Sequence, residues 1–463
     1  MNTRQIPGKD KIGSLAPGKY KTFEGTEISI ENCVKARVKD LRVEGKTYQN
    51  LFKAELNQGH ADSALISKKT LRVNSEGFNL PVKNFTISVP KEFEVSIYPN
   101  YVNNASGFSP WKNKIVWSNS SETNNIRIMI RKPDESEITV DEVIGKVILL
   151  EGDYTDTDLP TSIDGIESVG ENELNVLNIV NRGKNLFDPN NLESGSISPN
   201  SGTNVANSAQ VRSINFIEVK PSTSYMFNDS CRIFEYSKTK GYIGSSVINS
   251  QSFITSSNTY FLKLHKTIPE NGLIENIQLE EGTVATKYEP YREPSVTYLN
   301  LPIPLRSLPN GTCDTIEGNK LVQRVGKVVI DENIVVSSFT SRTNTLRVGL
   351  RVGAKPNVVE STIVTLSDKL QYSSSVYGKD IEGMYVSVSG VLYLSLKIDK
   401  YGNTLNEFLI KIKENPITIY YELAEQIIHD LEIPSISTTK GTNVITTTNN
   451  IKPNLKIKVK VKK

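Results

Sequence analysis

The chain is poor in the residues that metal centres, disulfide frameworks and many catalytic sites need. Its 463 residues include three cysteines, three histidines, four methionines and two tryptophans. Cys33, Cys231 and Cys313 lie far apart, so they match neither a disulfide framework nor a zinc site, where close pairs such as C-x-x-C are expected. We therefore expect three separate thiols in a protein made in a reducing cytosol.

Long apolar runs are also missing. The amino terminus lacks the apolar stretch of a signal peptide, and no apolar run reaches the roughly 18 residues that a membrane span needs. The sequence thus predicts neither Sec export nor membrane insertion, and work outside the cell would require release by lysis or assembly. The net charge of +3, from 54 basic and 51 acidic residues, gives no general argument for a nucleic-acid partner.

Short alternating runs dominate what is present. Segments such as KNFTISVPKEFEVSIYP and YVSVSGVLYLSLKI alternate apolar and polar residues with period two, and clusters of Gly, Pro, Asn and Ser separate them. Each such strand buries one face and exposes the other. The pattern predicts a mostly β chain of serial antiparallel, jelly-roll-like β-sandwich domains.

One segment breaks this pattern and predicts a short helix near residues 404–413. Thr404 and Glu407 form a capping box, and Asn415-Pro416 ends the segment because the residue before proline avoids the α conformation. We expect no other helix longer than about two turns. The apolar stripe of the predicted helix consists of Leu405, Phe408, Leu409 and Ile412.

Two pairs of phrases repeat along the chain. IGKVILLEGDYTDTDLP (144–160) and IENIQLEEGTVATKYEPY (274–291) both end a strand with Leu-Glu and a glycine, while GKTYQNLF (45–52) and GKNLFD (183–188) open two units. The spacing of about 135 residues points to duplicated sandwich domains, because solenoid repeats are roughly 20–50 residues long. The expected units, with a polar linker at 162–173, are an attachment segment (1–35), a first sandwich (36–172), a carbohydrate-binding-like sandwich (173–294) and a carboxy-terminal sandwich with the helix and a Lys-rich strand (295–463).

Residues 183–292 resemble the carbohydrate-binding-like jelly-roll modules in tail and minor structural proteins of phages that infect Gram-positive bacteria and of phage-tail-like bacteriocins. GKNLFD, IEVKPSTSYMF and IENIQLEEGTVATKYEPY carry this resemblance, and the last phrase is the most specific. LPIPLRSLPNGTCDTIE (301–317) and NEFLIKIKENPITIYYELAEQI (406–427) resemble the carboxy-terminal region of the same proteins. The resemblance implies a homo-oligomeric component of a virion tail, made in the host cytoplasm, without catalytic activity or cofactor.

The phrase that closes the second unit also has an interpretation from its own residues. Gly282 frees the backbone to turn. Tyr288 and Tyr291 would seal the edge of a sandwich, with direct ligand contact as the alternative. The adjacent Glu280 and Glu281 point to opposite faces of a strand, so they cannot flank one glycosidic bond. The module-closing motif comprises Gln278, Glu280, Glu281, Gly282, Tyr288 and Tyr291.

Aromatic residues are the candidates for ligand binding, because sugar rings stack on aromatic faces. Trp111 and Trp117 are six residues apart, so they would share a face if they lie on one strand. Phe234 and Tyr236 share a face as well, close to Tyr242 and to an expected hairpin turn at Lys240-Gly241. For both groups burial in the core is the preferred interpretation, and an exposed ligand-binding face is the alternative.

Acidic, histidine and lysine residues offer weaker candidates. Oxygens of Asp153, Asp156 and Asp158 would suit a structural calcium ion, with a solvated turn as the alternative. We expect the three histidines, His60, His265 and His429, to be ordinary surface residues, because no zinc or triad pattern includes them. The tail LKIKVKVKK (455–463) predicts an exposed edge strand, with a docking strand or an anionic contact as the alternative.

Together these observations predict a non-enzymatic structural protein of a phage-type tail, in the baseplate or tail fibre. Its partners would be other tail or baseplate proteins and a bacterial surface polysaccharide or surface protein. A pure virion scaffold that binds only neighbouring tail proteins is the second hypothesis. An enzyme that degrades cell-wall polysaccharide is the third.

Overall fold

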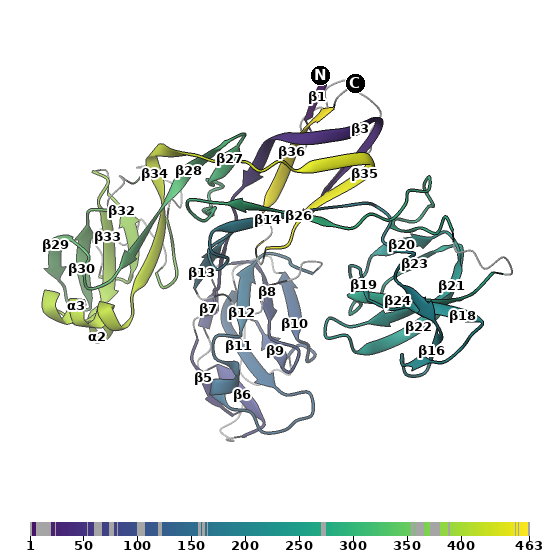
Figure 1. The fold of residues 1–463 in the computed structure, drawn as a ribbon. Helices are drawn as coiled ribbons and strands as arrows, with labels where there is room; N and C mark the ends of the chain where they lie inside the picture. The colour runs from purple at the N-terminus through teal and green to yellow at the C-terminus, as the bar shows by residue number, and fades with distance from the viewer. Residues whose placement is uncertain are drawn as a thin grey trace.

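The computed structural model describes residues 2–5, 20–23, 25–52, 54–59, 67–73, 78–80, 82–99, 107–118, 123–155, 159, 163, 165–269, 275–352, 356, 365–370, 380–387, 389–449, 451 and 453–461. The described residues form a mostly β protein, with 36 strands and three short helices, and each strand pairing is antiparallel. This confirms the predicted fold class. Figure 1 shows one central sheet from which three lobes hang.

The central sheet gathers strands from both ends and from the middle of the chain. Its main order is β26-β14-β35-β3-β27-β28-β34-β31, and β1, β2 and β36 pair beside this path. The 20-residue β3 pairs with β35, which lies near the other end of the sequence. The eleven strands are β1 (Asn2–Gln5), β2 (Tyr20–Phe23), β3 (Gly25–Glu44), β14 (Val176–Arg182), β26 (Ser295–Asn300), β27 (Thr315–Glu317), β28 (Lys320–Ile330), β31 (Thr365–Ser367), β34 (Ile417–Asp430), β35 (Ser437–Thr447) and β36 (Asn454–Val461).

Each lobe is an excursion of the chain from this sheet (Figure 1). Lobe 1 (residues 50–155) follows β3, lobe 2 (184–292) lies between β14 and β26, and lobe 3 (331–416 without β31) lies between β28 and β34. Within the range of lobe 3 the chain returns once to the central sheet, where β31 pairs with β34. Because β14 pairs with β26 and β28 pairs with β34, lobes 2 and 3 each enter and leave through two neighbouring strands. The domain boundaries expected near residues 172 and 294 stay predictions.

Lobe 1 is a two-sheet sandwich. A three-stranded sheet (β10-β8-β12) and a five-stranded sheet (β5-β6-β11-β7, with β9 beside β11) contribute side chains such as Phe85, Leu149, Val95 and Ile128 to one core. Its elements, with the nearby pair β4 and β13, are β4 (Thr47–Gln49), β5 (Leu56–Gln58), β6 (Thr70–Val73), β7 (Phe78–Leu80), β8 (Asn84–Ser88), β9 (Glu94–Tyr98), β10 (Lys114–Ser118), β11 (Thr123–Arg131), α1 (Val140–Val143), β12 (Ile148–Glu151) and β13 (Ile166–Ser168).

Lobe 2 is a second sandwich of the same kind. A six-stranded sheet (β15-β18-β24-β21-β22, with β19 beside β24) faces the three-stranded sheet β23-β20-β25 across a core that includes Ile233, Leu264, Phe227 and Leu279. Its strands are β15 (Leu192–Ser194), β16 (Ser196–Ile197), β17 (Asn204–Val205), β18 (Gln210–Ser213), β19 (Ile217–Glu218), β20 (Ser224–Phe227), β21 (Ser230–Tyr236), β22 (Tyr242–Asn249), β23 (Ser252–Ile254), β24 (Phe261–Thr267) and β25 (Leu279–Glu281).

Lobe 3 packs a sheet against the predicted helix. The sheet β29-β30-β33-β32 consists of β29 (Val336–Ser341), β30 (Thr345–Leu350), β33 (Leu392–Lys397) and β32 (Gly383–Val386). The helix α3 (Leu405–Glu414) carries the expected capping box, in which the N–H of Glu407 donates to the Thr404 hydroxyl at 3.2 Å. Phe408 and Ile412 are buried as predicted, whereas Leu405 is 40% exposed because it lies in the first turn. The other described helices, α1 and α2 (Ile398–Tyr401), have four residues each, as expected.

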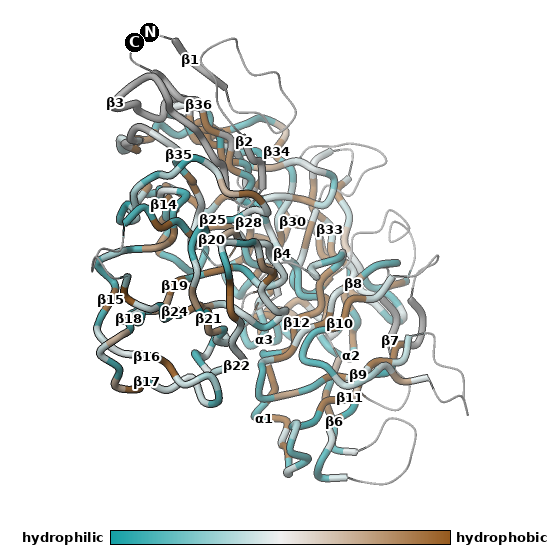
Figure 2. The backbone as a smooth tube through the Cα atoms, turned by 90° about the vertical axis from the view of Figure 1, so that its right-hand side faces the viewer, coloured by the Kyte–Doolittle hydropathy of each residue, from teal (hydrophilic) through white to brown (hydrophobic). Residues whose placement is uncertain are grey.

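Hydrophobic residues recur in short stretches along the strands (Figure 2). On β24, for example, Leu262 and Leu264 are buried in the lobe 2 core while Phe261 and Lys263 lie on the other face and are half-buried. This period-two burial confirms the alternation read from the sequence. Within the described ranges, no helix is long and apolar enough to cross a membrane.

One expectation about the central sheet was wrong. The Lys-rich β36 pairs with β3 on one side and with β1 on the other at residues 458–461, so it is not an exposed edge there. The described part of the expected linker forms a bonded junction: β13 pairs with β4, Lys327 donates to Glu171 at 2.7 Å, and the hydroxyl of Tyr420 also donates to Glu171. The role of this segment as a boundary between two units stays a prediction.

Asp314, in the phrase LPIPLRSLPNGTCDTIE, ties the central strands together. Its buried carboxylate accepts backbone N–H groups of Arg306 at 3.0 Å, Arg324 at 2.7 Å and Val325 at 2.9 Å. Burial raises the pKa of Asp314 to about 6, although the three hydrogen bonds oppose that shift. The phrase therefore has a structural role at the start of β28.

Candidate functional site

The predicted aromatic residues of the second unit lie together on one face of lobe 2. This face of the six-stranded sheet points away from the main core, because Ile233 faces that core and its neighbours Arg232 and Phe234 face the other side. The ring of Phe234 lies 5.1 Å from the ring of His265, which accepts the N–H of Ile197 at 2.9 Å. We name this group the outer aromatic cluster; it comprises Ile197, Phe216, Phe234, Tyr236, Tyr242 and Phe261.

The hairpin of β16 and β17 packs against part of the outer aromatic cluster. The Tyr236 hydroxyl donates to the carbonyl of Gly202 at 2.9 Å, and the Tyr242 hydroxyl donates to the carbonyl of Pro199. Gly202 has φ +67°, and a Cβ there would lie 2.6 Å from the Tyr242 ring, so glycine allows this close approach. Phe234 and Tyr236 are buried, in agreement with the interpretation of these residues as core, whereas Tyr242 is half-buried.

Phe216 and Phe261 complete the cluster and are more accessible than its centre. Both are half-buried; the Phe216 ring lies 4.9 Å from Tyr236 and 5.7 Å from Phe261. The sequence reasoning missed both. The alternation of Phe261 with the buried Leu262 was a signal, but Phe216 lies between β18 and β19 and no periodicity marks it.

Two lysines lie over these accessible rings. The Lys263 Nζ is 4.7 Å from the centre of the Phe216 ring, and the Lys240 Nζ is 5.1 Å from it and 5.7 Å from the Phe261 ring. Burial lowers the pKa of Lys263, and Arg212 and Lys240 lower it further while Glu193 opposes them. We call Phe216, Phe261, Lys240 and Lys263 the lysine patch. The turn predicted at Lys240-Gly241 is present, because β21 pairs with β22 across it.

Trp111 and Trp117 do not share one strand. β10 begins at Lys114, so Trp111 lies before it, and the Arg131 guanidinium lies 4.4 Å from the Trp111 ring centre. Trp117 packs against the lobe 1 core, and its indole N–H has no hydrogen-bond partner among the described residues. The even spacing of the two residues was thus misleading, because the chain is not one extended strand between them.

The two motifs of the second unit meet at a buried asparagine. The Asn185 amide donates to the carbonyls of Ile277 and Glu289, each at 3.0 Å, and its side-chain oxygen accepts N–H groups from Phe187 at 3.0 Å and Leu279 at 3.1 Å. Asn185 therefore joins GKNLFD to the phrase IENIQLEEGTVATKYEPY and closes lobe 2.

Asn50 closes lobe 1 in the same way. Its amide donates to the carbonyls of Val147 at 2.8 Å and Ile163 at 3.2 Å, and its side-chain oxygen accepts from Phe52 at 3.1 Å and Leu149 at 3.0 Å. Both asparagines stand in the tripeptide Asn-Leu-Phe, and both bond the strand that ends in Leu-Glu and a glycine. The internal repeat read from the sequence thus corresponds to the same local structure in two lobes.

The module-closing motif surrounds Asn185 with a polar network. The buried Glu280 accepts the Gln278 amide at 2.7 Å, and the Thr286 N–H at 2.7 Å and hydroxyl at 2.6 Å. The Lys184 ammonium lies 3.9 Å from Glu280 and 3.4 Å from Glu289. Glu280 is thus occupied by structural hydrogen bonds.

The rest of the motif faces outward. Glu281 points away from Glu280, as predicted, and forms an ion pair with Lys220 at 3.0 Å. Gly282 has φ +141°, which favours glycine. Tyr288 is 38% exposed, and Tyr291 is half-buried with its hydroxyl 3.4 Å from the Glu293 carboxylate.

Glu289 links lobe 2 to the central sheet. Its carboxylate accepts the N–H of Thr442 at 2.7 Å and the Thr442 hydroxyl at 2.9 Å, and Arg292 donates to the Thr442 carbonyl. Gly441, with φ +96°, leaves the space that this carboxylate occupies. The phrase IENIQLEEGTVATKYEPY, which contains Glu289, therefore also anchors the lobe.

The calcium candidate rests on residues that are only partly described. Asp153 is exposed and accepts the N–H and hydroxyl of Thr155 at 2.8 and 2.6 Å, a local turn that lowers its pKa. Asp156 and Asp158 lie outside the described residues, as does His60. Within the ranges that the structure describes, no group of three or more His, Cys, Asp or Glu could hold a metal ion. His429 is half-buried and lies 3.0 Å from the amide oxygen of Gln323.

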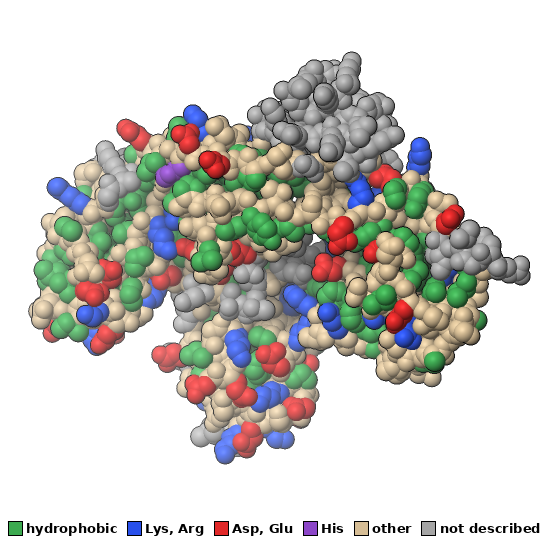
Figure 3. Space-filling view, viewed as in Figure 1, with side chains coloured by type: hydrophobic (Ala, Val, Ile, Leu, Met, Phe, Trp, Pro, Cys, Tyr) green, Lys and Arg blue, Asp and Glu red, His purple; other side chains and the backbone are tan. Residues whose placement is uncertain are grey.

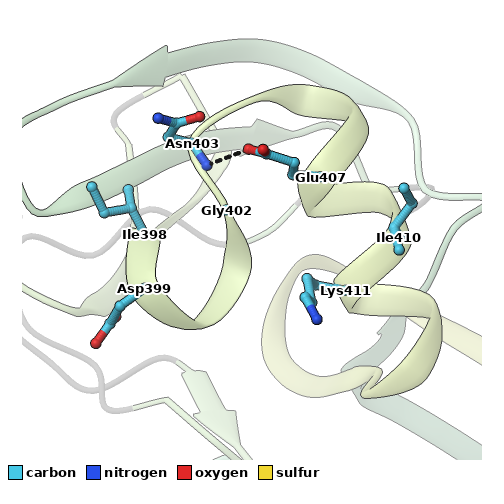
Figure 4. Close-up of a pocket in the computed structure, with 7 residues that line it drawn as sticks. All are labelled: Ile398, Asp399, Gly402, Asn403, Glu407, Ile410 and Lys411. Carbon is cyan, nitrogen blue, oxygen red and sulfur yellow. Dashed lines mark hydrogen bonds between the residues drawn. The ribbon is translucent and has the colours of Figure 1, made fainter.

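Two hollows lie at the surface of the described structure. The side chains that line them take part in structural contacts and do not converge as a catalytic group would. The larger, of about 540 Å³, lies between α2 and α3, where the Glu407 carboxylate accepts the Asn403 N–H at 3.0 Å (Figure 4). The other, of about 280 Å³, lies beside Phe52 and Ile144 of lobe 1, near Asp368. Charged side chains of both signs are scattered over the face in Figure 3.

Comparison of the chain with protein-family models, with curated proteins and with solved structures gave no match. The resemblance to phage-tail proteins therefore stays a prediction.

Proposed function

We propose that this chain is a non-enzymatic structural component of a phage or phage-like tail, in the baseplate or tail fibre, and that its lobes contact glycan or protein on the host surface. The observation that supports this most is the repeated closure of lobes 1 and 2 by Asn50 and Asn185. The lobes extend from a central sheet that contains strands from both ends of the chain. Such a chain combines one central sheet with separate modules that are available for contact.

Contact by several copies would let weak sites hold a particle on a cell. Effective concentrations in the millimolar range make several weak contacts act as one strong contact. A homo-oligomer beside other tail or baseplate proteins would supply those copies. The half-buried rings of Phe216 and Phe261, with cations above them, offer a surface for such contact.

Adsorption blocking tests this proposal. Purified full-length protein, added to host cells before the particles, should reduce the number of particles that adsorb, and protein unfolded by heat should not. Sites saturated by free protein are closed to the particle, so the effect should grow with concentration. Unchanged adsorption at saturating protein, or release of sugars from purified cell walls by the protein, would contradict the proposal.

A pure scaffold is the second candidate, and exposed apolar side chains on the central sheet favour it. Val296 is 46% and Tyr298 63% exposed on the outer strand β26. Among the described residues β26 pairs only with β14, which leaves an edge for another chain. A scaffold would bind neighbouring tail proteins in a mixing experiment and leave adsorption unchanged.

A further inference from the structure

The lysine patch concentrates positive charge that the neighbouring carboxylate does not balance. Lys240 and Arg212 are the cations, and Glu193 the acid, that lie close enough to act on the Lys263 ammonium. The Glu193 carboxylate already binds the Arg212 guanidinium at 2.8 Å. The Lys263 ammonium donates to the Ile214 carbonyl at 2.9 Å, which uses one of its three N–H donors. Among the described residues no carboxylate forms an ion pair with Lys240 or Lys263, so both positive charges can still attract an external anion.

The position of Lys240 carries a conformational cost. Its φ is +63°, in the left-handed region that non-glycine residues rarely occupy, and its N–H donates to the Ser237 carbonyl at 2.8 Å within the turn. Asn and Gly adopt this conformation more easily than lysine. Lys240 is one of seven described non-glycine residues with a positive φ. This turn holds the Lys240 ammonium above Phe216 and Phe261.

The surroundings of the lysine patch suit a sugar polymer. The neighbouring hairpin exposes hydroxyl and amide side chains at Ser201, Thr203 and Asn204. These groups bind the hydroxyls of a glycan, and the half-buried rings supply an apolar floor. A nucleic acid would require a longer basic stripe, because each phosphate contact adds to its affinity. The near-balanced charge of the chain offers no general argument for one.

We infer that the lysine patch binds an anionic glycan, a sugar or polyol polymer that carries phosphate or carboxylate groups, with the anion held between the ammonium groups of Lys240 and Lys263. This inference rests on the proposed function and names the chemical class of its ligand. The ammonium groups would exchange their contacts with the aromatic rings for charge-assisted hydrogen bonds to the anion.

Binding of the full-length protein to immobilised polymers tests the inference. The polymers are polygalacturonate, polyglycerol phosphate, neutral dextran and duplex DNA. The wild type should bind one or both anionic glycans and not dextran, and the carboxylate and phosphate polymers identify the anion. Salt at about 0.5 M should abolish binding, because the screening length then falls to a few ångströms.

Substitutions at the patch should separate binding from folding. Lys240→Asn relieves the backbone strain, so it should leave the melting temperature unchanged or raised, and with Lys263→Gln it should weaken glycan binding at least tenfold. Lys400→Gln is the matched control, because the Lys400 Nζ also lies over a ring, 5.3 Å from Tyr401 in lobe 3. It should bind like the wild type.

Three results would overturn the inference: equal binding of dextran, tightest binding of DNA, or an unchanged affinity in the double variant. If the double variant loses no affinity and still blocks adsorption, the lysine patch is excluded and the proposed function stands. If the wild type binds no glycan and also fails to block adsorption, both proposals fail.

Discussion

Replacing the buried asparagine that closes lobe 1 or lobe 2 should lower the free energy of unfolding of that lobe, by an amount that follows from its hydrogen bonds. Asn185 is 2% exposed, and four hydrogen bonds of 3.0–3.1 Å end on its side chain. Asn185→Ala removes all four and leaves buried N–H and carbonyl groups unpaired. Each net hydrogen bond contributes about 1 kcal/mol, so the free energy of unfolding of lobe 2 should fall by about 3–5 kcal/mol. Asn50→Ala should cost lobe 1 a similar amount.

Tryptophan fluorescence tells the two lobes apart, because Trp111 and Trp117, the two tryptophans of the chain, both lie in lobe 1. In urea unfolding, Asn50→Ala should lower the midpoint of the fluorescence transition. Asn185→Ala should leave that transition in place and lower a separate transition seen by circular dichroism. The exposed Asn200 is the control, and its alanine variant should change either value by less than about 0.5 kcal/mol.

Two results would refute this reasoning. If Asn185→Ala costs less than about 1 kcal/mol, the four hydrogen bonds do not close the lobe. If both asparagine variants shift the fluorescence transition equally, the lobes do not unfold as separate units. In the double variant the two costs should add, because residues without shared partners act independently.

Three further predictions concern single residues in lobe 2, at the central sheet and in lobe 3. Gly202→Ala places a Cβ 2.6 Å from the Tyr242 ring, so it should lower the stability of lobe 2 in thermal unfolding by about 1–3 kcal/mol. Gly244→Ala is the control and should leave the stability unchanged, because no atom lies within 4 Å of its Cβ. Burial raises the Asp314 pKa to about 6, above its value of 3.8 in the unfolded chain. Between pH 4 and pH 6 the unfolded chain therefore loses a proton that the folded protein keeps, so the free energy of unfolding should fall by roughly 3 kcal/mol over this range. Above pH 6 the free energy of unfolding should no longer change with the titration of Asp314. Asp314→Asn should lack this pH dependence in urea titrations; an unchanged slope would contradict the assignment. Thr404→Ala should cost about 1 kcal/mol in thermal unfolding by removing the helix cap, and Thr404→Ser should retain the stability.

Local features of the fold were predictable because local chemistry determines them. The helix at Leu405–Glu414 follows from its capping box and from Pro416, and the strands follow from period-two alternation. The duplicated closure was visible as Asn-Leu-Phe and a Leu-Glu ending with a glycine, although the role of the asparagine was not inferred. These signals lie within a few residues of one another.

The central sheet was not predictable from such signals. β3 pairs with β35 and β36, about 400 residues further along the chain, and no local pattern records that choice. The lysine patch was missed for a similar reason, because Phe216 lies in a connection and is brought to Lys240 and Lys263 only by the folding of lobe 2. Trp111 and Trp117 show the converse limit: their even spacing predicts a shared face only on one continuous strand, and β10 begins between them at Lys114.

Immunogold labelling of purified particles with antibodies to this chain locates the protein on the particle. A tail component whose lobes contact the host should be labelled at the tail tip or baseplate, where the lobes would meet a cell surface. Particles that carry no label at the tail, although the antibody recognises the purified protein, would contradict the proposed function.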